Sequence, residues 1–282
     1  MNEVQNAMEK AVGLNKSSVG NSDKAVEKKS VRFEPGEAKG MTMHPNNPCI
    51  ITNGNPDSPI AEEYRKLKTV ILRMTREEFR NTVMVTSAVS GEGKSLTSAN
   101  LAIMLAREYG QTVLLVDADL RRPSLHEYLG MGSHVGLADC LEDRIDAGKA
   151  MVKTGIQKLS FMSAGKKVEN PSELLSSQRM REFLLELKHR YQDRYIIIDT
   201  APILLFAETQ AMSMLVDGVL VVVKEGGVSL QGLTQMFEVL KGANVLGMVY
   251  NNASTTSLGG KYYEHYQHYY HDDRHGKKQK KR

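Results

Sequence analysis

Residues 82–99 read TVMVTSAVSGEGKSLTSA, and this stretch decides the fold. A short β-branched run at 82–86 leads into AVSGEGKS at 88–95, which has the form A-x-x-x-x-G-K-S of a phosphate-binding loop, with Ala where Gly is more usual. Small residues let successive backbone N–H groups turn inward around an anion, and Lys94 adds a positive charge near the β- and γ-phosphates. A Gly-containing surface turn is the plain alternative. The flanking pattern favours a nucleotide site.

A helix is expected directly after the loop, because apolar residues recur at helical spacing there: Leu101, Met104, Leu105 and Tyr109. Gly110 would end this helix. The positive end of the helix would point at the phosphates, and the Ser95 hydroxyl would bind Mg²⁺. The predicted nucleotide-binding residues in and directly after the loop are Ser90, Gly91, Glu92, Gly93, Lys94, Ser95 and Leu96.

The composition is that of a globular protein with polar ends. The chain has 282 residues, 41% of them hydrophobic, and a mean hydropathy of −0.37. Its apolar runs are far shorter than the roughly 18 residues that a membrane span needs. The N-terminus lacks the pattern of a secretory signal. Cys49 and Cys140 have no metal-ligand spacing and are expected to be reduced thiols, which suits a cytoplasmic location.

Three regions differ in composition. Residues 1–57 are polar and lack periodicity, so we expect a flexible arm, with two alternatives for its last ten residues, free or pinned to the body. Residues 58–256 alternate strand-like and helix-like segments and form the predicted domain. Residues 257–282 form a tail. Residues 261–282 carry seven Lys or Arg and three acids, which accounts for the net charge of +4. The body shows no nucleic-acid-binding pattern, so no nucleic-acid partner is expected.

Two further strands are predicted to end in acids. The strand at 112–116 runs into Asp117-Ala118-Asp119, and the strand at 195–198 runs into Asp199. Ligands bind open α/β sheets at the carboxyl ends of their strands, where these carboxylates would lie. A cation or a proton is their natural use, and an ordinary acidic turn is the alternative. Four apolar residues followed by an Asp, downstream of a phosphate loop, indicate a residue near the Mg²⁺ shell.

The remaining periodicity predicts a mostly parallel α/β sheet with helices on both faces. Ser58-Pro59 would begin a helix whose apolar face is Ile60, Tyr64, Leu67, Ile71 and Met74. Glu62, Arg65 and Lys68 lie on its other side and are by default solvated charges. Further strands are expected at 158–163, 219–224 and 245–250, and further helices around 139–141, after Asn170-Pro171, along 180–191, at 207–216 and at 230–242.

The tail combines aromatic residues and histidines. It holds five of the eleven tyrosines, Tyr262, Tyr263, Tyr266, Tyr269 and Tyr270, and four of the eight histidines. An aromatic helical stripe and a histidine metal site are both alternatives for such spacing. A dense tyrosine cluster between a diglycine and a basic end indicates that these tyrosines are a substrate segment and not part of a packed core.

These motifs together resemble the bacterial tyrosine kinases, the P-loop autokinases of capsule and exopolysaccharide synthesis. The resemblance covers about residues 58–256, plus the tail by character. The stretches that carry it are EEYRKLKTVI (62–71), SAVSGEGKSLTSANLA (87–102), VLLVDADLRRPSLH (113–126), GLADCLE (136–142), ENPSELLSS (169–177), YIIIDTAPIL (195–204) and VLGMVYNN (245–252).

The resemblance implies a role for each matched residue. Lys94 would hold the β- and γ-phosphates of ATP. Ser95, Asp119 and Asp199 would bind Mg²⁺ directly or through water. Asp117 would accept the proton of the incoming tyrosine hydroxyl, although the roles of Asp117 and Asp119 could be reversed. Asn251 matches a position that contacts adenine. Glu62, Arg65 and Lys68 match a subunit-contact motif, with Lys where the family has Arg.

The resemblance also implies partners. Family members phosphorylate the tyrosine cluster of a neighbouring subunit, typically in a ring that phosphorylation dissolves. A separate integral-membrane activator, the polysaccharide co-polymerase, would recruit this chain to the inner face of the cell membrane, and a cognate tyrosine phosphatase fits the same scheme. The main alternative is a partition or division-site ATPase that dimerises on nucleotide. Those proteins carry a second lysine early in the loop, where this chain has Val89.

Overall fold

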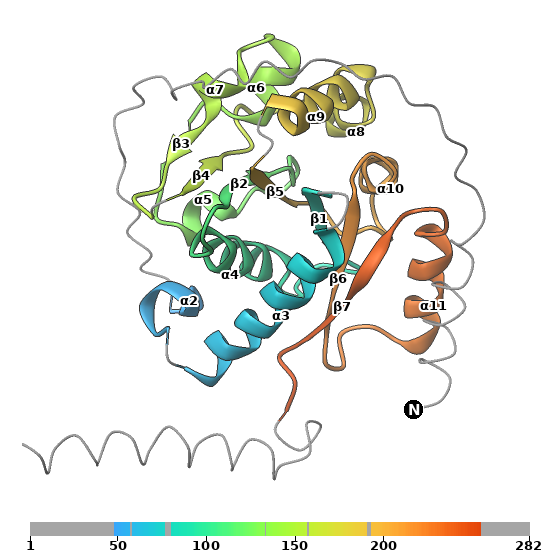
Figure 1. The fold of residues 1–282 in the computed structure, drawn as a ribbon. Helices are drawn as coiled ribbons and strands as arrows, with labels where there is room; N and C mark the ends of the chain where they lie inside the picture. The colour runs from blue at the N-terminus through green and yellow to red at the C-terminus, as the bar shows by residue number, and fades with distance from the viewer. Residues whose placement is uncertain are drawn as a thin grey trace, which may run out of the picture.

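The computed structural model describes residues 48–56, 58–76, 80–132, 134–156, 158–190 and 193–254. A sheet in the order β3-β4-β2-β5-β1-β6-β7 forms the centre of the molecule (Figure 1). Its strands are β1 Thr82–Ser87, β2 Thr112–Asp117, β3 Val152–Lys153, β4 Leu159–Met162, β5 Arg194–Asp199, β6 Gly218–Lys224 and β7 Val245–Asn251. The short β3 pairs antiparallel with β4, and the other pairings are parallel. The predicted mostly parallel α/β fold is confirmed.

Helices cover both faces of the sheet (Figure 1). On one side of the sheet lie α2 Ile51–Gly54, α3 Pro59–Thr75, α4 Lys94–Ala106 and α5 Leu125–Tyr128. The opposite face packs against α6 Leu137–Glu142, α7 Ala147–Ala150, α8 Pro171–Leu175, α9 Gln178–Arg190, α10 Ala207–Ser213 and α11 Leu230–Val239. Helix α4 packs directly on β1, β2 and β5, whereas α3 packs on α4.

The central strands are apolar along their whole length because both faces are covered. In β1, Val83 and Val85 belong to the core on the α4 side, whereas Met84 belongs to the core on the α9 side. All three side chains are fully buried. The continuous apolar runs read from the sequence therefore mark buried parallel strands.

Two details of the predicted helices are wrong. The helix after the phosphate loop ends at Ala106, and Tyr109 is 93% exposed beyond it, so Tyr109 does not continue the apolar stripe. In α3, Ile71 is buried but Ile60 and Met74 are 46% and 44% exposed. Helix α3 contacts α2 and α4, and only its middle packs deeply. Its start is as predicted, since the Ser58 hydroxyl accepts a hydrogen bond from Ala61 N.

Part of the predicted N-terminal arm packs on the body. Asn100 of α4 accepts a hydrogen bond from Thr52 N at 3.1 Å and donates one to the Cys49 carbonyl at 2.9 Å. Ile50 is buried in the core. The packed region therefore includes residues 48–56. Residues 1–47 and 255–282, which include the predicted tail at 257–282, lie outside the described residues. Among the described residues, no helix is both long and apolar enough to cross a membrane.

Candidate nucleotide and phosphoryl-transfer site

Three neighbouring strands bring the predicted site residues to one edge of the sheet. Strand β5 lies between β1, which leads into the phosphate loop, and β2, which ends in Asp117. The register pairs Asp117 with Asp199 across β2 and β5. Because these strands are parallel, their carboxyl ends meet where open α/β sheets bind ligands. The strand order thus gathers motifs that are far apart in the sequence.

The phosphate loop has the expected strand–loop–helix context. Strand β1 ends at Ser87, and α4 begins at Lys94 after a loop in which Gly91 and Gly93 have φ of 83° and 92°. Only glycine adopts such angles without strain. A side chain at Gly93 would also meet the amide of Asn251, whose Nδ2 would lie 2.1 Å from a Cβ at that position. Both glycines are therefore needed for the loop's shape.

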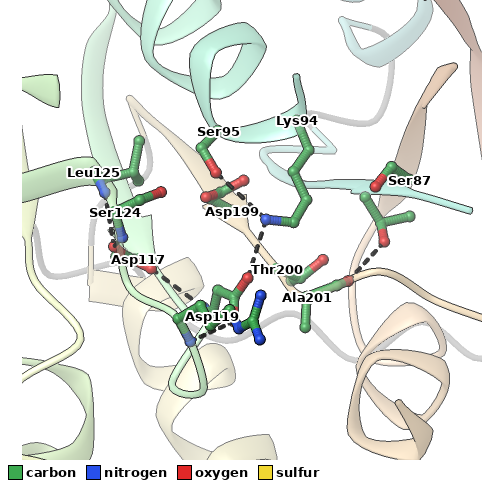
Figure 2. Close-up of polar contacts among 12 residues, drawn as sticks. Ser87, Lys94, Ser95, Asp117, Asp119, Ser124, Leu125, Asp199, Thr200 and Ala201 are labelled. Carbon is green, nitrogen blue, oxygen red and sulfur yellow. Dashed lines mark hydrogen bonds and ion pairs between the residues drawn. The ribbon is translucent and has the colours of Figure 1, made fainter. Parts of the chain in front are cut away.

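Lys94 is held among the acids (Figure 2). Its Nζ lies 3.0 Å from Asp119 Oδ2 and 3.4 Å from Ser95 Oγ. Burial alone would lower the pKa of Lys94, but the carboxylates of Asp199 and Asp119 raise it above the ordinary lysine value. Lys94 is therefore a firmly charged cation that can be redirected to an incoming phosphate.

Asp117 is fully buried, and backbone groups occupy both of its oxygens. Oδ2 accepts hydrogen bonds from Ser124 N and Leu125 N at 3.1 Å, and Oδ1 accepts one from Asp119 N at 3.2 Å. Burial, reinforced by the Asp199 carboxylate, raises the pKa of Asp117 to about 8. Asp117 therefore shapes the turn that presents Asp119. The choice of catalytic base between these two acids stays a prediction.

Asp199 has one engaged oxygen and one free oxygen. Oδ1 accepts a hydrogen bond from Ser98 Oγ at 3.1 Å, while the buried Oδ2 has no hydrogen-bond partner among the described residues. Burial raises the pKa of Asp199 to about 6, although the positive charge of Lys94 opposes the shift. A buried carboxylate oxygen without a partner is costly unless a ligand completes it.

The oxygens of Ser95, Asp119 and Asp199 fit the predicted Mg²⁺ site. Within the described ranges, no three His, Cys, Asp or Glu side chains are arranged to enclose a metal ion by themselves. Mg²⁺ usually takes one or two protein carboxylates and completes its shell with substrate phosphates and water. The free Oδ2 of Asp199 beside a hydroxyl and a second carboxylate matches that requirement.

Asn251 reaches the phosphate loop. Its Nδ2 donates a hydrogen bond to the Glu92 carbonyl at 2.8 Å from the end of β7. The predicted adenine contact through Asn251 stays a prediction. The contact to Glu92 was not predicted, because the two residues are far apart in sequence and the sequence gives no sign of the order β1-β6-β7.

Sequence reasoning also missed an ion pair beside the acids. Arg121 Nε bonds to Glu208 Oε1, and its guanidinium lies 4.5 Å from the centre of the Phe206 ring. Burial opposes ionisation of Glu208, but the hydrogen bond from Arg121 holds its pKa below the ordinary value. The pair joins the loop after β2 to the start of α10, so it links the chain segments that follow Asp119 and Asp199. The run of charges after Asp119 was the available signal.

The predicted interface residues of α3 pair within the chain. Arg65 forms an ion pair with Glu62, and Lys68 Nζ lies 2.5 Å from Glu108 Oε2. Their role in subunit contact stays a prediction. The tail tyrosines, Tyr262 to Tyr270, lie outside the described residues. Leu96 lies in the first turn of α4 and packs partly buried against the core.

A strand, a glycine-containing loop with Lys94 and Ser95, and acids at the ends of the adjacent strands define a P-loop nucleotide-binding protein. Residues 80–247 match a family described as "AAA domain". The chain is 34% identical over 215 residues to tyrosine-protein kinase YwqD of Bacillus subtilis, and the alignment covers 76% of this chain and 88% of YwqD.

Tyrosine-protein kinase etk of Escherichia coli is 33% identical over 208 residues, with 71% of this chain but only 28% of etk covered. The solved kinase domain of ETK superposes with a TM-score of 0.67 at 28% identity, over 72% of this chain and 79% of that domain. The chain belongs to the bacterial tyrosine-protein kinase family, and the enzyme class predicted from the sequence is confirmed.

The alternative of a division-site ATPase shares the fold more distantly. The septum site-determining protein MinD from Pyrococcus horikoshii superposes with a TM-score of 0.50 at 24% identity, over 60% of this chain and 69% of that one. That likeness concerns the fold alone. Val89, in the place of the second lysine of such proteins, is partly buried against the core.

Proposed function

We propose that the chain is an ATP-dependent tyrosine autokinase whose acceptors are the five tail tyrosines of a neighbouring subunit. The observation that carries the proposal is the position of Lys94. It lies in a phosphate loop, in contact with Asp119 and close enough to Asp199 for its charge to lower the pKa of that carboxyl. The family membership and the tyrosine cluster between residues 262 and 270 support the choice of acceptor.

Each residue has a task in this proposal. The backbone N–H groups of residues 90–94 hold the phosphates, and Lys94 turns from Asp119 to the β- and γ-phosphates and stabilises charge as the bond to the γ-phosphoryl group breaks. Ser95, Asp119 and Asp199 hold Mg²⁺, which neutralises phosphate charge when bound. Asp117 or Asp119 accepts the proton of the tyrosine hydroxyl. The tyrosine oxygen gains the phosphoryl group, and ADP leaves.

Regulation would follow from charge. Each phosphate adds about −1.5 to −2 charge at neutral pH, so several phosphates would reverse the sign of a tail that starts basic. We propose that this change weakens a ring-like assembly built through the Glu62, Arg65 and Lys68 side of α3. We also propose that a separate membrane protein recruits and activates the kinase, and that the pathway served is capsule or exopolysaccharide synthesis. A cognate phosphatase would restore the starting charge.

The experiment uses purified full-length chain, Mg²⁺ and labelled ATP, with the cytoplasmic segment of the activator supplied. Wild-type protein is expected to carry phosphotyrosine between Tyr262 and Tyr270, whereas Lys94→Met and a chain truncated after Gly260 carry none there. Label on the Lys94→Met protein, or wild-type label that never lies within the tail cluster, would show that the proposal is wrong.

A further inference from the structure

A carboxylate is buried inside the phosphate loop, and neither catalysis nor metal binding uses it. Glu92 is 1% exposed, although it belongs to a loop of small residues at the surface of a nucleotide site. Its Oε2 accepts a hydrogen bond from Val89 N at 2.9 Å, within the same loop. Its Oε1 accepts one from Lys224 N at 3.3 Å, at the end of β6. The side chain therefore points away from the phosphate site and into the protein.

The main chain of Glu92 is held as well. Asn251 Nδ2, from the end of β7, donates to the Glu92 carbonyl at 2.8 Å. A Cβ at Gly227 would lie 3.4 Å from Oε1, so the turn after β6 also packs against the carboxylate. Strands β6 and β7 thus hold Glu92 through two hydrogen bonds, one to its side chain and one to its main chain.

The chemistry of the two side-chain contacts requires a carboxylate. Both partners of the Glu92 side chain are N–H donors, and an ionised carboxylate is the side-chain group that offers two acceptor oxygens and no donor. A glutamine would place its NH₂ against one of these N–H groups. Because Val89 N donates to Glu92 Oε2, this N–H group is already paired. The N–H groups of residues 90–94 are then the ones left for the phosphates.

We infer that Glu92 is a positioning residue that holds the phosphate loop in its anion-binding shape before nucleotide arrives, by tying Val89 to the end of β6. The inference rests on the nucleotide site proposed above. In this role the Glu92 carboxylate strengthens nucleotide binding, whereas by Coulomb repulsion alone a negative charge beside bound phosphates would weaken it. A purely electrostatic role and a positioning role therefore predict opposite results when the charge is removed.

The test is equilibrium binding of Mg²⁺ with the slowly hydrolysed analogue adenosine 5′-(β,γ-imido)triphosphate to the full-length chain. Glu92→Gln is expected to bind about tenfold or more weakly than wild type, since a hydrogen bond to a charged group is lost and a buried N–H is left facing another donor. Glu225→Gln is the matched control. It removes a negative charge from the neighbouring turn, where Glu225 Oε1 bonds to Ser254 Oγ, and is expected to bind as wild type does.

Glu92→Asp is a second variant, which keeps the test decisive if Glu92→Gln does not fold. It keeps the charge but is one methylene too short to reach both N–H groups, so it is expected to fold and still bind the analogue more weakly than wild type. Wild-type or tighter binding by Glu92→Gln would overturn the inference, and so would wild-type binding by a folded Glu92→Asp if Glu92→Gln does not fold. Failure of the wild-type chain itself to bind the analogue would instead refute the proposed nucleotide site.

Discussion

Acids lie at both ends of the parallel strands, and their surroundings differ: Asp117 and Asp199 at the carboxyl ends are fully buried, whereas Asp217 at the amino ends is partly exposed. At the carboxyl edge, Asp117 and Asp199 stand side by side, their pKa values are raised by burial, and one oxygen of Asp199 has no partner among the described residues. At the amino edge, Asp217 accepts hydrogen bonds from Thr82 N and Thr82 Oγ1 at 3.0 and 2.6 Å and pairs with Lys188.

The two acids also differ in the free energy needed to ionise them in the folded protein. Burial opposes the ionisation of Asp217, but its bonds to Lys188 and Thr82 hold its pKa below the ordinary value. Asp217 is therefore stabilised as a carboxylate by the fold, whereas Asp199 is ionised at a cost that a bound cation would repay. A buried charge that only a ligand can satisfy lowers the stability of the ligand-free protein. The Asp199 carboxylate is therefore expected to lower the stability of the nucleotide-free protein, and the bonds of Asp217 are expected to raise it.

The largest effect is expected for Asp199→Asn. Removing the carboxylate from the proposed metal site should lower the rate of tail phosphorylation by at least about a hundredfold, the scale seen when one transition-state contact is lost. The same change should leave the thermal midpoint of the nucleotide-free protein unchanged or raise it, because it removes a poorly solvated charge. Autophosphorylation rate and thermal denaturation measure the two effects.

The pH dependence sharpens this prediction. A carboxyl group whose folded pKa is raised to about 6 lowers stability progressively as pH rises from its unfolded pKa, about 3.9, to 6. Any gain of Asp199→Asn over wild type should therefore be full at pH 7 and absent below pH 4. A variant that is less stable than wild type at pH 7 would break the comparison between the two edges.

A smaller effect is expected for Asp217→Asn, which should lower stability and leave the phosphorylation rate unchanged. The substitution weakens the bonds to Thr82 and Lys188 and should lower the free energy of unfolding by about 1–3 kcal/mol at pH 7. The rate of tail phosphorylation per folded molecule should stay close to wild type, because the amino edge is remote from the proposed site. Denaturant titration and kinase assays at matched folded fraction test both statements.

The stability difference for Asp217→Asn has its own pH window. Because the folded pKa of Asp217 is lowered, its contribution is present above the unfolded value of about 3.9 and is lost as pH falls through the folded pKa. Wild type and variant should therefore converge in acid, the reverse of the trend at Asp199. A difference that does not shrink as pH falls below the unfolded value of about 3.9 would mean that packing, not charge, sets the effect.

The sequence predicted the long elements and the chemistry of the carboxyl edge well. Strand β1, the loop and the two acid-bearing strands carry motifs with fixed spacing, and continuous apolar runs mark strands buried on both faces. The helices α2, α5 and α7 were not predicted, because each has four residues and shows no periodicity. The antiparallel β3, with two residues, gives no pattern either.

The contacts that depend on strand order could not be predicted. The bonds from Lys224 and Asn251 to Glu92 exist because β6 and β7 follow β1 in the sheet, and a linear sequence does not state that order. Asp217 lies before an apolar strand and looks like an ordinary loop acid until the register places it against Thr82. Local pattern predicts elements, whereas these partners come from topology.

Transfer between subunits is the central claim, and a mixing experiment tests it most directly. The donor is a full-length chain with all five tail tyrosines, Tyr262, Tyr263, Tyr266, Tyr269 and Tyr270, replaced by Phe, and the acceptor is full-length Lys94→Met. With Mg²⁺, ATP and the activator segment, neither protein alone should gain phosphotyrosine in its tail, and the mixture should gain it on the Lys94→Met chain. A mixture that stays unlabelled while wild-type protein labels its own tail would contradict transfer between subunits.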